Sequence, residues 1–184
     1  RTYFNKFDRA VFQSHLHADR AVEEKIDPAK IVVLGSARFC PEWQEINLRI
    51  QPERFAPRKG EGCTHRVAFM VTQWDYNVDF DATVQTLRRL AAEPWIHLVL
   101  KPHPREVEKR PAYLRDLESL PNVETAPAVA SPALIQWADS VLVTGSSIAL
   151  EVLGQGKNLI HPHYLHGNTT VFQEAGSEWQ VDND

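Results

Sequence analysis

The chain has few cysteines, no long apolar run and no excess of positive charge. Its 184 residues include two cysteines, Cys40 and Cys63, outside any CxxC pair, so neither a structural zinc site nor a disulfide framework is expected. No apolar run approaches the length of about 18 residues that a membrane span needs. The 20 Lys and Arg residues against 24 Asp and Glu residues give a net charge of −4. This balance argues against bulk nucleic-acid binding through a basic face.

The composition is that of a folded domain. Hydrophobic residues make up 43% of the chain and charged residues 24%, which is ordinary for globular proteins and wrong for disordered or fibrous ones. The sequence opens on Arg1 rather than Met, and no signal-peptide pattern follows. We therefore expect a cytoplasmic protein in a reducing compartment, and we expect this chain to be a piece of a longer one.

Short β-branched runs alternate with longer amphipathic stretches. Continuous apolar runs such as residues 67–71 and 141–143 are typical of strands buried on both faces, as in parallel sheets. The alternation favours a doubly wound α/β domain with crossover connections. The expected strands are residues 10–13, 31–35, 67–72, 96–100, 123–125, 141–144, 158–161 and 179–181.

Helices are expected between these strands, at residues 15–25, 79–92, 111–120, 132–138 and 147–153. In the second of them, apolar residues recur near one helical face: Phe80, Val84, Leu87, Leu90 and Ala91.

The pattern divides the chain into three parts. The six expected strands after Arg66 predict one Rossmann-like domain with a parallel sheet over residues 66–184. Residues 39–65 are polar and rich in Pro and Gly, which indicates a linker. Residues 1–38 hold a strand, a helix and a strand, which we interpret as the remnant of a preceding domain.

Two loops carry residues suited to phosphate binding. The first, Lys101-Pro102-His103-Pro104-Arg105, follows an expected strand, and ligands of open α/β sheets bind beyond the carboxyl ends of strands. Its prolines fix the backbone. Its three basic side chains offer charge-assisted hydrogen bonds, which are about twice as strong as neutral ones. A stiffened loop with solvated charges is the alternative interpretation.

The second loop, Thr144-Gly145-Ser146-Ser147, lies between an expected strand and an expected helix, and a helix N-terminus favours an anion. Glu151 comes one turn after Ser147 and would point back toward the same pocket. Its carboxylate could accept hydrogen bonds from both hydroxyls of a ribose. Alternatively, Ser147 caps the helix and Glu151 lies on the surface.

Further residues are candidates for contact with a donor or an acceptor. His161, His163 and His166 form an HxHxxH cluster, but no nearby carboxylate or cysteine completes a metal shell. We therefore favour a ligand-facing loop over a metal site. The candidates for donor or acceptor contact are Arg38, Gln73, Trp74, His161 and Asn168.

Together these motifs resemble the C-terminal, nucleotide-binding half of GT-B glycosyltransferases. The resemblance rests on KPHP after one strand, GSSxxxE after a later one, and GK before the strand NLIHP. It is greatest to bacterial surface-polysaccharide enzymes that use cytidine-activated donors: Kdo transferases, bacterial sialyltransferases and CDP-glycerol glycerophosphotransferases. Residues 11–36 also resemble the end of the N-terminal GT-B domain and the crossing to the next one.

The resemblance implies a donor site. In these enzymes an HP motif and a Ser-Ser motif bind the phosphate and ribose of the donor nucleotide, and His103-Pro104 and Ser146-Ser147 match them. The implied donor-nucleotide residues are Lys101, His103, Pro104, Gly145, Ser146, Ser147 and Glu151.

The implied enzyme transfers a sugar or polyol phosphate from a CMP- or CDP-linked donor, in preference to a UDP-linked one, to a saccharide or glycolipid acceptor. Capsule or lipopolysaccharide synthesis is the implied role, in the cytoplasm or peripherally at the inner membrane face. No cofactor, metal or nucleic acid is implied.

Other functions stay open. The acidic catalytic residue of sialyltransferases, which lies in an N-terminal motif, has no counterpart here, so we expect this chain alone to be inactive in transfer. GSSxxxE and GK also resemble UDP-N-acetylglucosamine 2-epimerases. A non-catalytic nucleotide-sugar-binding domain is the third interpretation.

Overall fold

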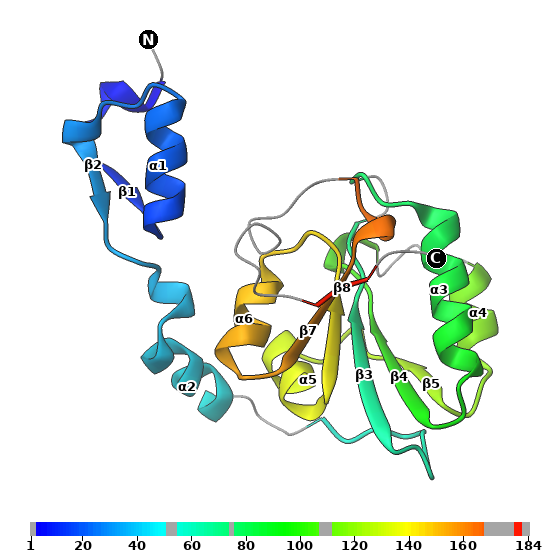
Figure 1. Ribbon diagram of the computed structural model, residues 1–184. Coiled ribbons are helices and arrows are strands. Elements are labelled where there is room, and N and C mark those ends of the chain that lie inside the picture. The colour runs from blue at the N-terminus through cyan, green and yellow to red at the C-terminus, as the bar shows by residue number, and fades with distance from the viewer. Residues whose placement is uncertain (1–2, 51–54, 74–75, 107–111, 168–178, 182–184) are drawn as a thin grey trace. The chain divides into compact units, whose positions relative to one another are not determined.

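The chain divides into two units, residues 1–45 and residues 46–184, and the larger one is built on a parallel sheet (Figure 1). The computed structural model describes residues 3–50, 55–73, 76–106, 112–167 and 179–181. Among the described residues, no helix has the length and apolar character that crossing a bilayer requires.

The smaller unit is the expected strand-helix-strand motif. Strand β1 (Ala10–Phe12) pairs in parallel with β2 (Ile31–Val33), and α1 (His15–Glu23) connects them. The hydroxyl of Ser14 accepts a hydrogen bond from His17 N and so caps α1, which explains why the helix begins where it does.

The stretch expected to be a linker contains a helix, α2 (Pro41–Ile50). Proline at the first helical position is favourable because its missing N–H would have no partner there. The Pro- and Gly-rich composition further along the stretch masked this signal in the sequence.

The sheet of the larger unit has the strand order β5-β4-β3-β6-β7-β8, with every neighbouring pair parallel. This is the 3-2-1-4-5-6 order of doubly wound folds, whose switch point lies between the first and fourth strands, here β3 and β6. The strands are β3 (His65–Met70), β4 (Ile96–Lys101), β5 (Val123–Thr125), β6 (Ser140–Val143), β7 (Asn158–Pro162) and β8 (Trp179–Val181).

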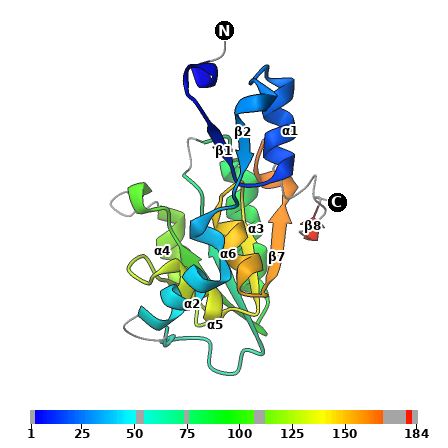
Figure 2. The same cartoon turned by 90° about the vertical axis from the view of Figure 1, so that its left-hand side faces the viewer.

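Helices cover both faces of this sheet. They are α3 (Phe80–Ala92), α4 (Ala112–Glu118), α5 (Ser131–Trp137) and α6 (Ile148–Gly154). Helices α3 and α4 lie on one face (Figure 1), and α5 and α6 lie on the other, which Figure 2 views from in front. All eight expected strands and all five expected helices are confirmed, with ends that differ by at most two residues.

Alternate residues of each strand enter two separate cores. Val67 and Phe69 pack on the α3 side, whereas Ala68 and Met70 pack with α5 and α6. Burial on both faces explains why these strands read as continuous apolar runs.

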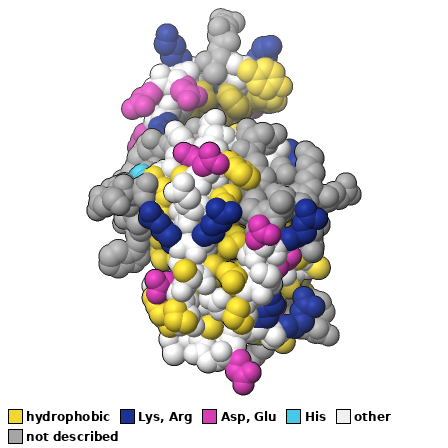
Figure 3. Space-filling model, turned by 90° about the vertical axis from the view of Figure 1, so that its right-hand side faces the viewer, with side chains coloured by type: hydrophobic (Ala, Val, Ile, Leu, Met, Phe, Trp, Pro, Cys, Tyr) yellow, Lys and Arg dark blue, Asp and Glu magenta, His cyan; other side chains and the backbone are white. Residues whose placement is uncertain are grey.

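The expected apolar face of α3 is confirmed in part. Val84, Leu87 and Ala91 are buried, and Leu90 packs against them. Phe80, the first residue of the helix, is 42% exposed. On the outer surface seen in Figure 3, positive and negative side chains are interspersed, which is typical of a solvated protein surface.

The segment before β3 is tied to the amino end of the sheet. Arg58 N donates to Glu124 Oε2 at 3.2 Å, Lys59 Nζ donates to Leu120 O at 3.0 Å, and Gly60 N donates to Pro121 O at 3.1 Å. These bonds fix residues 58–60 against β5 and the turn that precedes it.

Beneath this segment, a histidine and a carboxylate are buried side by side. His97 Nε2 lies 3.4 Å from Glu124 Oε1, and both side chains are buried. Burial lowers the pKa of His97, although the neighbouring Glu124 carboxylate opposes the shift. Gly60 lies directly against this ring: a Cβ there would come closer than 3.0 Å to three ring atoms of His97.

We expect Gly60→Ala to destabilise the protein more than Gly62→Ala. Both glycines have positive φ, +78° and +83°, but a Cβ at Gly62 meets nothing within 4 Å. Both variants therefore carry backbone strain of about 1–2 kcal/mol, and only Gly60→Ala adds a clash with His97, which costs about 1–3 kcal/mol more. Denaturant unfolding measures the difference, and equal losses in the two variants would contradict the contact.

We expect the free energy of unfolding to fall as pH drops below the ordinary His97 pKa of 6.5. Because burial lowers the pKa of His97 in the folded state, the unfolded chain binds more protons between the folded pKa and 6.5. The stabilisation is therefore fully present above this window and is lost as pH falls through it. Unfolding measured from pH 8 to pH 5 should show a smaller pH slope for His97→Gln than for the wild type, and an identical slope would refute this role.

Candidate functional site

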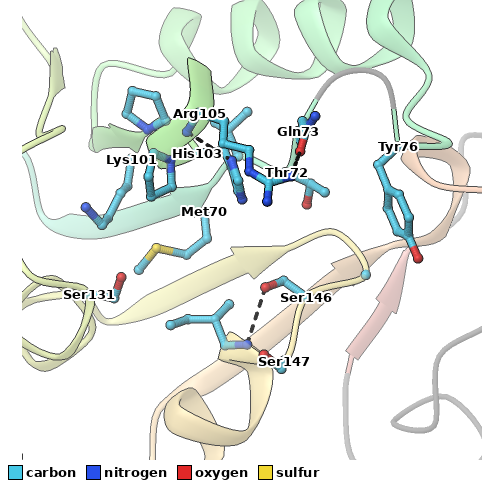
Figure 4. A pocket seen from close by; sticks show the side chains of 15 residues that line it. Met70, Thr72, Gln73, Tyr76, Lys101, His103, Arg105, Ser131, Ser146 and Ser147 are labelled. Atoms are coloured by element: carbon cyan, nitrogen blue, oxygen red, sulfur yellow. Dashed lines mark hydrogen bonds between the residues drawn. The ribbon is translucent and has the colours of Figure 1, made fainter. Parts of the chain in front are cut away.

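A pocket of about 450 Å³ opens at the carboxyl ends of three neighbouring strands (Figure 4). Its wall consists of residues 70–73 at the end of β3, residues 101–105 at the end of β4 and residues 145–148 after β6, with Tyr76 and Ser131. The pocket thus lies at the switch point of the sheet, where doubly wound folds bind their ligands.

Lys101 is the last residue of β4 and lines the pocket on the α5 side. Its ammonium donates to Pro127 O at 3.2 Å, and burial lowers the pKa of Lys101. A partly desolvated ammonium of this kind is stabilised by an anion, so a phosphate in the pocket would be a favourable partner.

His103 is held in one orientation by the turn that follows it. Its Nδ1 accepts a hydrogen bond from Arg105 N at 3.3 Å, as Pro104 begins a short 3₁₀ turn (Pro104–Glu106). The neutral ring therefore carries its proton on Nε2. His103 is thus prepared to donate one hydrogen bond from Nε2 to a ligand.

Arg105 links the loops that follow β3 and β4. Its Nη1 donates to Gln73 Oε1 at 3.4 Å. Because an amide is neutral, this bond does not cancel the charge of Arg105, and a guanidinium can bind phosphate oxygens in a bidentate manner.

The hydroxyls of the two serines in the second loop have different environments. Ser146 Oγ accepts from Ile148 N at 3.4 Å, so Ser146 bonds the first turn of α6. Ser147 takes helical backbone angles (φ −60°, ψ −10°) and makes no side-chain capping bond, because an N-cap needs an extended backbone. Ser147 thus holds the N-cap position of α6 without a capping bond from its side chain, and it lines the pocket.

Gly145 lets this loop approach the chain behind it. It has φ +61°, and a Cβ there would lie 2.6 and 2.7 Å from two atoms of the buried His166 ring. Only glycine fits both the left-handed backbone and this close contact.

Thr72 was not predicted as a site residue, and it links the chain after β3 to the chain after β6. Its hydroxyl lies 2.7 Å from the hydroxyl of Thr144 and also donates to the Thr144 carbonyl. A lone Thr after a strand carries no sequence signal, because its partner is 72 residues away. Tyr76, Met70 and Ser131 were also missed as pocket residues.

The structure brings most of the expected site residues together. Figure 4 shows the basic side chains on one side of the pocket and the two serines on the other, with Met70 between them. The expected residues that line the pocket are Gln73, Lys101, His103, Pro104, Gly145, Ser146 and Ser147.

Three of the other expected residues do not line the pocket, and two lie outside the described part of the chain. Glu151 was expected to point into the pocket but is absent from its lining, and its side chain is buried within the domain. His161 is 2% exposed in β7 and does not line the pocket either. Arg38 lies in the smaller unit, over the ring of Phe39. Trp74 and Asn168 lie outside the described residues.

Within the described part of the chain, no group of three or more His, Cys, Asp or Glu side chains is arranged to hold a metal ion. The polar groups of the pocket are cations and hydroxyls, which suit an anion. Fold and site together define a Rossmann-type domain with a pocket at its switch point that is lined by basic side chains and hydroxyls.

The comparisons with known proteins agree with this class. No protein-family model and no curated protein matches the chain. Solved structures do: a UDP-N-acetylglucosamine 2-epimerase from Neisseria meningitidis bound to UDP-N-acetylglucosamine has a TM-score of 0.68 at 18% identity, over 92% of this chain and 47% of that one. A Listeria monocytogenes protein assigned to the same activity has a TM-score of 0.64 at 16% identity, over 95% and 47%.

A glycosyltransferase is similar as well. The pneumococcal O-GlcNAc transferase, in complex with UDP and GlcNAc, has a TM-score of 0.56 at 11% identity, over 98% of this chain and 35% of that one. The chain spans about half the length of the epimerases it matches. At these identities the likeness establishes the fold: the chain has the Rossmann-like, parallel-sheet architecture of GT-B-type proteins.

We expect Ser146→Ala and Ser147→Ala to affect stability differently. Ser146→Ala removes the hydroxyl that bonds Ile148 N and should lower the free energy of unfolding by about 0.5–1 kcal/mol. Ser147 makes no capping bond, so its substitution should change stability by less than that. Urea unfolding of both variants tests the assignment, and the opposite order would show that the two roles are exchanged.

Proposed function

We propose that this chain binds the nucleotide-activated donor of a GT-B glycosyltransferase in the pocket at the switch point. One observation carries the proposal: Lys101, His103 and Arg105 after β4 share a pocket with Ser146 and Ser147 after β6. Positive charge, a fixed imidazole donor and serine hydroxyls at this place suit the phosphate of a nucleotide. The family resemblance of the two motifs supports the same ligand.

The pocket contacts also suit the chemistry of transfer. When the bond between the sugar and the nucleotide phosphate breaks, negative charge develops on the departing phosphate. The cations of Lys101 and Arg105 and the Nε2–H of His103 stabilise that charge, and preorganised donors do so without reorganising as the reaction proceeds. The catalytic base and the acceptor site belong to the N-terminal half, which must hold both reactants in one geometry.

The donor we propose is linked to CMP or CDP, and the transferred group is a sugar or polyol phosphate of a bacterial surface polysaccharide, capsule or lipopolysaccharide. This choice rests on KPHP together with the Ser-Ser motif, which resemble the cytidine-using enzymes. We place the work in the cytoplasm or at the inner membrane face, where a glycolipid acceptor is available.

Epimerisation of UDP-N-acetylglucosamine is the second candidate. The motifs GSSxxxE and GK favour it, and so does the similarity to the Neisseria enzyme. Isothermal titration with CMP, CDP, UDP and UDP-N-acetylglucosamine separates the candidates. A preference for cytidine supports transfer, a preference for UDP-N-acetylglucosamine supports epimerisation, and the absence of binding would overturn both.

We expect His103→Ala and Ser147→Ala each to weaken binding of the preferred nucleotide about ten- to a hundredfold. Each removes one hydrogen bond to a charged phosphate, which is worth about 1.5–3 kcal/mol. Neither should change folding, because both side chains belong to the pocket wall. Titration calorimetry measures the affinities, and circular dichroism checks the fold.

Arg88→Ala is the matched control. Arg88 is an exposed cation on α3, outside the pocket lining, so its loss changes the net charge as a pocket arginine would without touching the ligand. Equal, small effects of all three substitutions would show that the phosphate binds elsewhere.

A further inference from the structure

Tyr76 is a pocket residue that the phosphate-binding role does not use. Its side chain is 57% exposed although it lines the pocket. Figure 4 shows it at the opposite side from Lys101 and Ser131. We propose that Tyr76 contacts the sugar of the donor and so helps to determine which nucleotide-linked sugar binds; the inference rests on the proposed function.

Tyr76 is held in place by a backbone hydrogen bond and by a ring contact. Tyr76 N donates to Gln73 O at 3.1 Å, and the ring centroid lies 6.0 Å from that of the buried His166 at an interplanar angle of 43°. An aromatic ring that is backed in this way loses little freedom when a ligand covers its other side.

The residues after Tyr76 are paired with the segment that carries His166. Gly167 N donates to Asn77 O at 2.9 Å, Asp79 N donates to Leu165 O at 3.0 Å, and Val78 forms an antiparallel bridge with His166. The same His166 ring lies against Gly145. Tyr76 and the loop of residues 144–147 are therefore both positioned by contact with His166. The distance between them is therefore set by the fold.

The two ends of the pocket differ in enclosure. Met70 is buried, and Lys101 and Ser131 are half-buried, whereas Tyr76 is exposed. In any transfer or isomerisation the sugar is the reacting part of the donor and must meet its second reactant, while the nucleoside is a spectator. The open end therefore suits the sugar, and the enclosed end suits the nucleoside.

The chemistry of a tyrosine matches a sugar ring. Its face is apolar with a negative quadrupole, which favours the C–H face of a pyranose, and its hydroxyl can exchange a hydrogen bond with a sugar hydroxyl. The phosphates then lie between this contact and the nucleoside, beside His103 and Ser147.

The test compares nucleotides with and without their sugar on this chain. Isothermal titration measures CMP against CMP-N-acetylneuraminate and UDP against UDP-N-acetylglucosamine, for the wild type, Tyr76→Ala and Tyr76→Phe. For the pair that binds, Tyr76→Ala should weaken the nucleotide sugar about three- to tenfold and leave the free nucleotide unchanged. Tyr76→Phe should retain most of the affinity, because it keeps the ring.

Trp95→Ala is the control. Trp95 is an aromatic residue of similar exposure, 47%, and it lies at the amino end of β4, with its indole N–H donating to Glu93. Its substitution should alter neither affinity.

The outcomes separate this inference from the proposed function. Equal weakening of nucleotide and nucleotide sugar by Tyr76→Ala would mean that the ring contacts the nucleoside, and no change in either would mean that it contacts neither; both results overturn the inference. If the nucleotide still responds to His103→Ala in those cases, the proposed function stands. Failure of every probe, and of CDP, to bind the wild type would overturn the proposed function and the inference together.

Discussion

Parallel pairing of β3 with β4 on one side and with β6 on the other decides where the candidate ligand contacts lie. Met70 is opposite Lys101 in one ladder and opposite Val143 in the other, so the three strands end at one edge of the sheet. The loops that follow them then meet, although they are far apart in the sequence. The hydrogen bond between the hydroxyls of Thr72 and Thr144 joins the segments that follow β3 and β6.

The sequence was sufficient to predict what depends on local pattern. Apolar runs such as residues 67–71 located the strands because burial on both faces leaves no polar position in them. KPHP and GSS located the pocket because both follow strands. Helix α2 was missed because Pro41 and the breaker-rich residues beyond it resemble a linker, although Pro at a first helical position is favourable.

Contacts between distant segments could not be predicted in this way. Thr72 and Tyr76 depend on Thr144 and His166, and nothing in the local sequence announces such partners. Spacing alone placed Glu151 one turn after Ser147 and so toward the ligand. It did not anticipate that the Glu151 side chain is buried and does not line the pocket. Which of the two serines bonds the first turn of α6 through its hydroxyl depends on backbone angles that a sequence does not reveal.

The positive groups at the two ends of the sheet have different partners: carboxylates at the amino end and neutral groups at the carboxyl end. This contrast favours an anionic ligand in the pocket. At the amino end, Arg66 forms a 2.5 Å pair with Asp139 and holds the pKa of that carboxyl at about 2, and Arg58 Nε lies 4.0 Å from Glu124 Oε2. At the carboxyl end, the described partners of the cations are neutral: Lys101 contacts a carbonyl and Arg105 an amide. Among the described residues, the cations of the pocket thus contact neutral groups, whereas Arg66 at the amino end contacts a carboxylate. A bound phosphate would pair with the cations of the pocket as Asp139 pairs with Arg66 at the amino end. The difference between the two ends therefore favours ligand binding over structural charge pairing as the role of the KPHP loop.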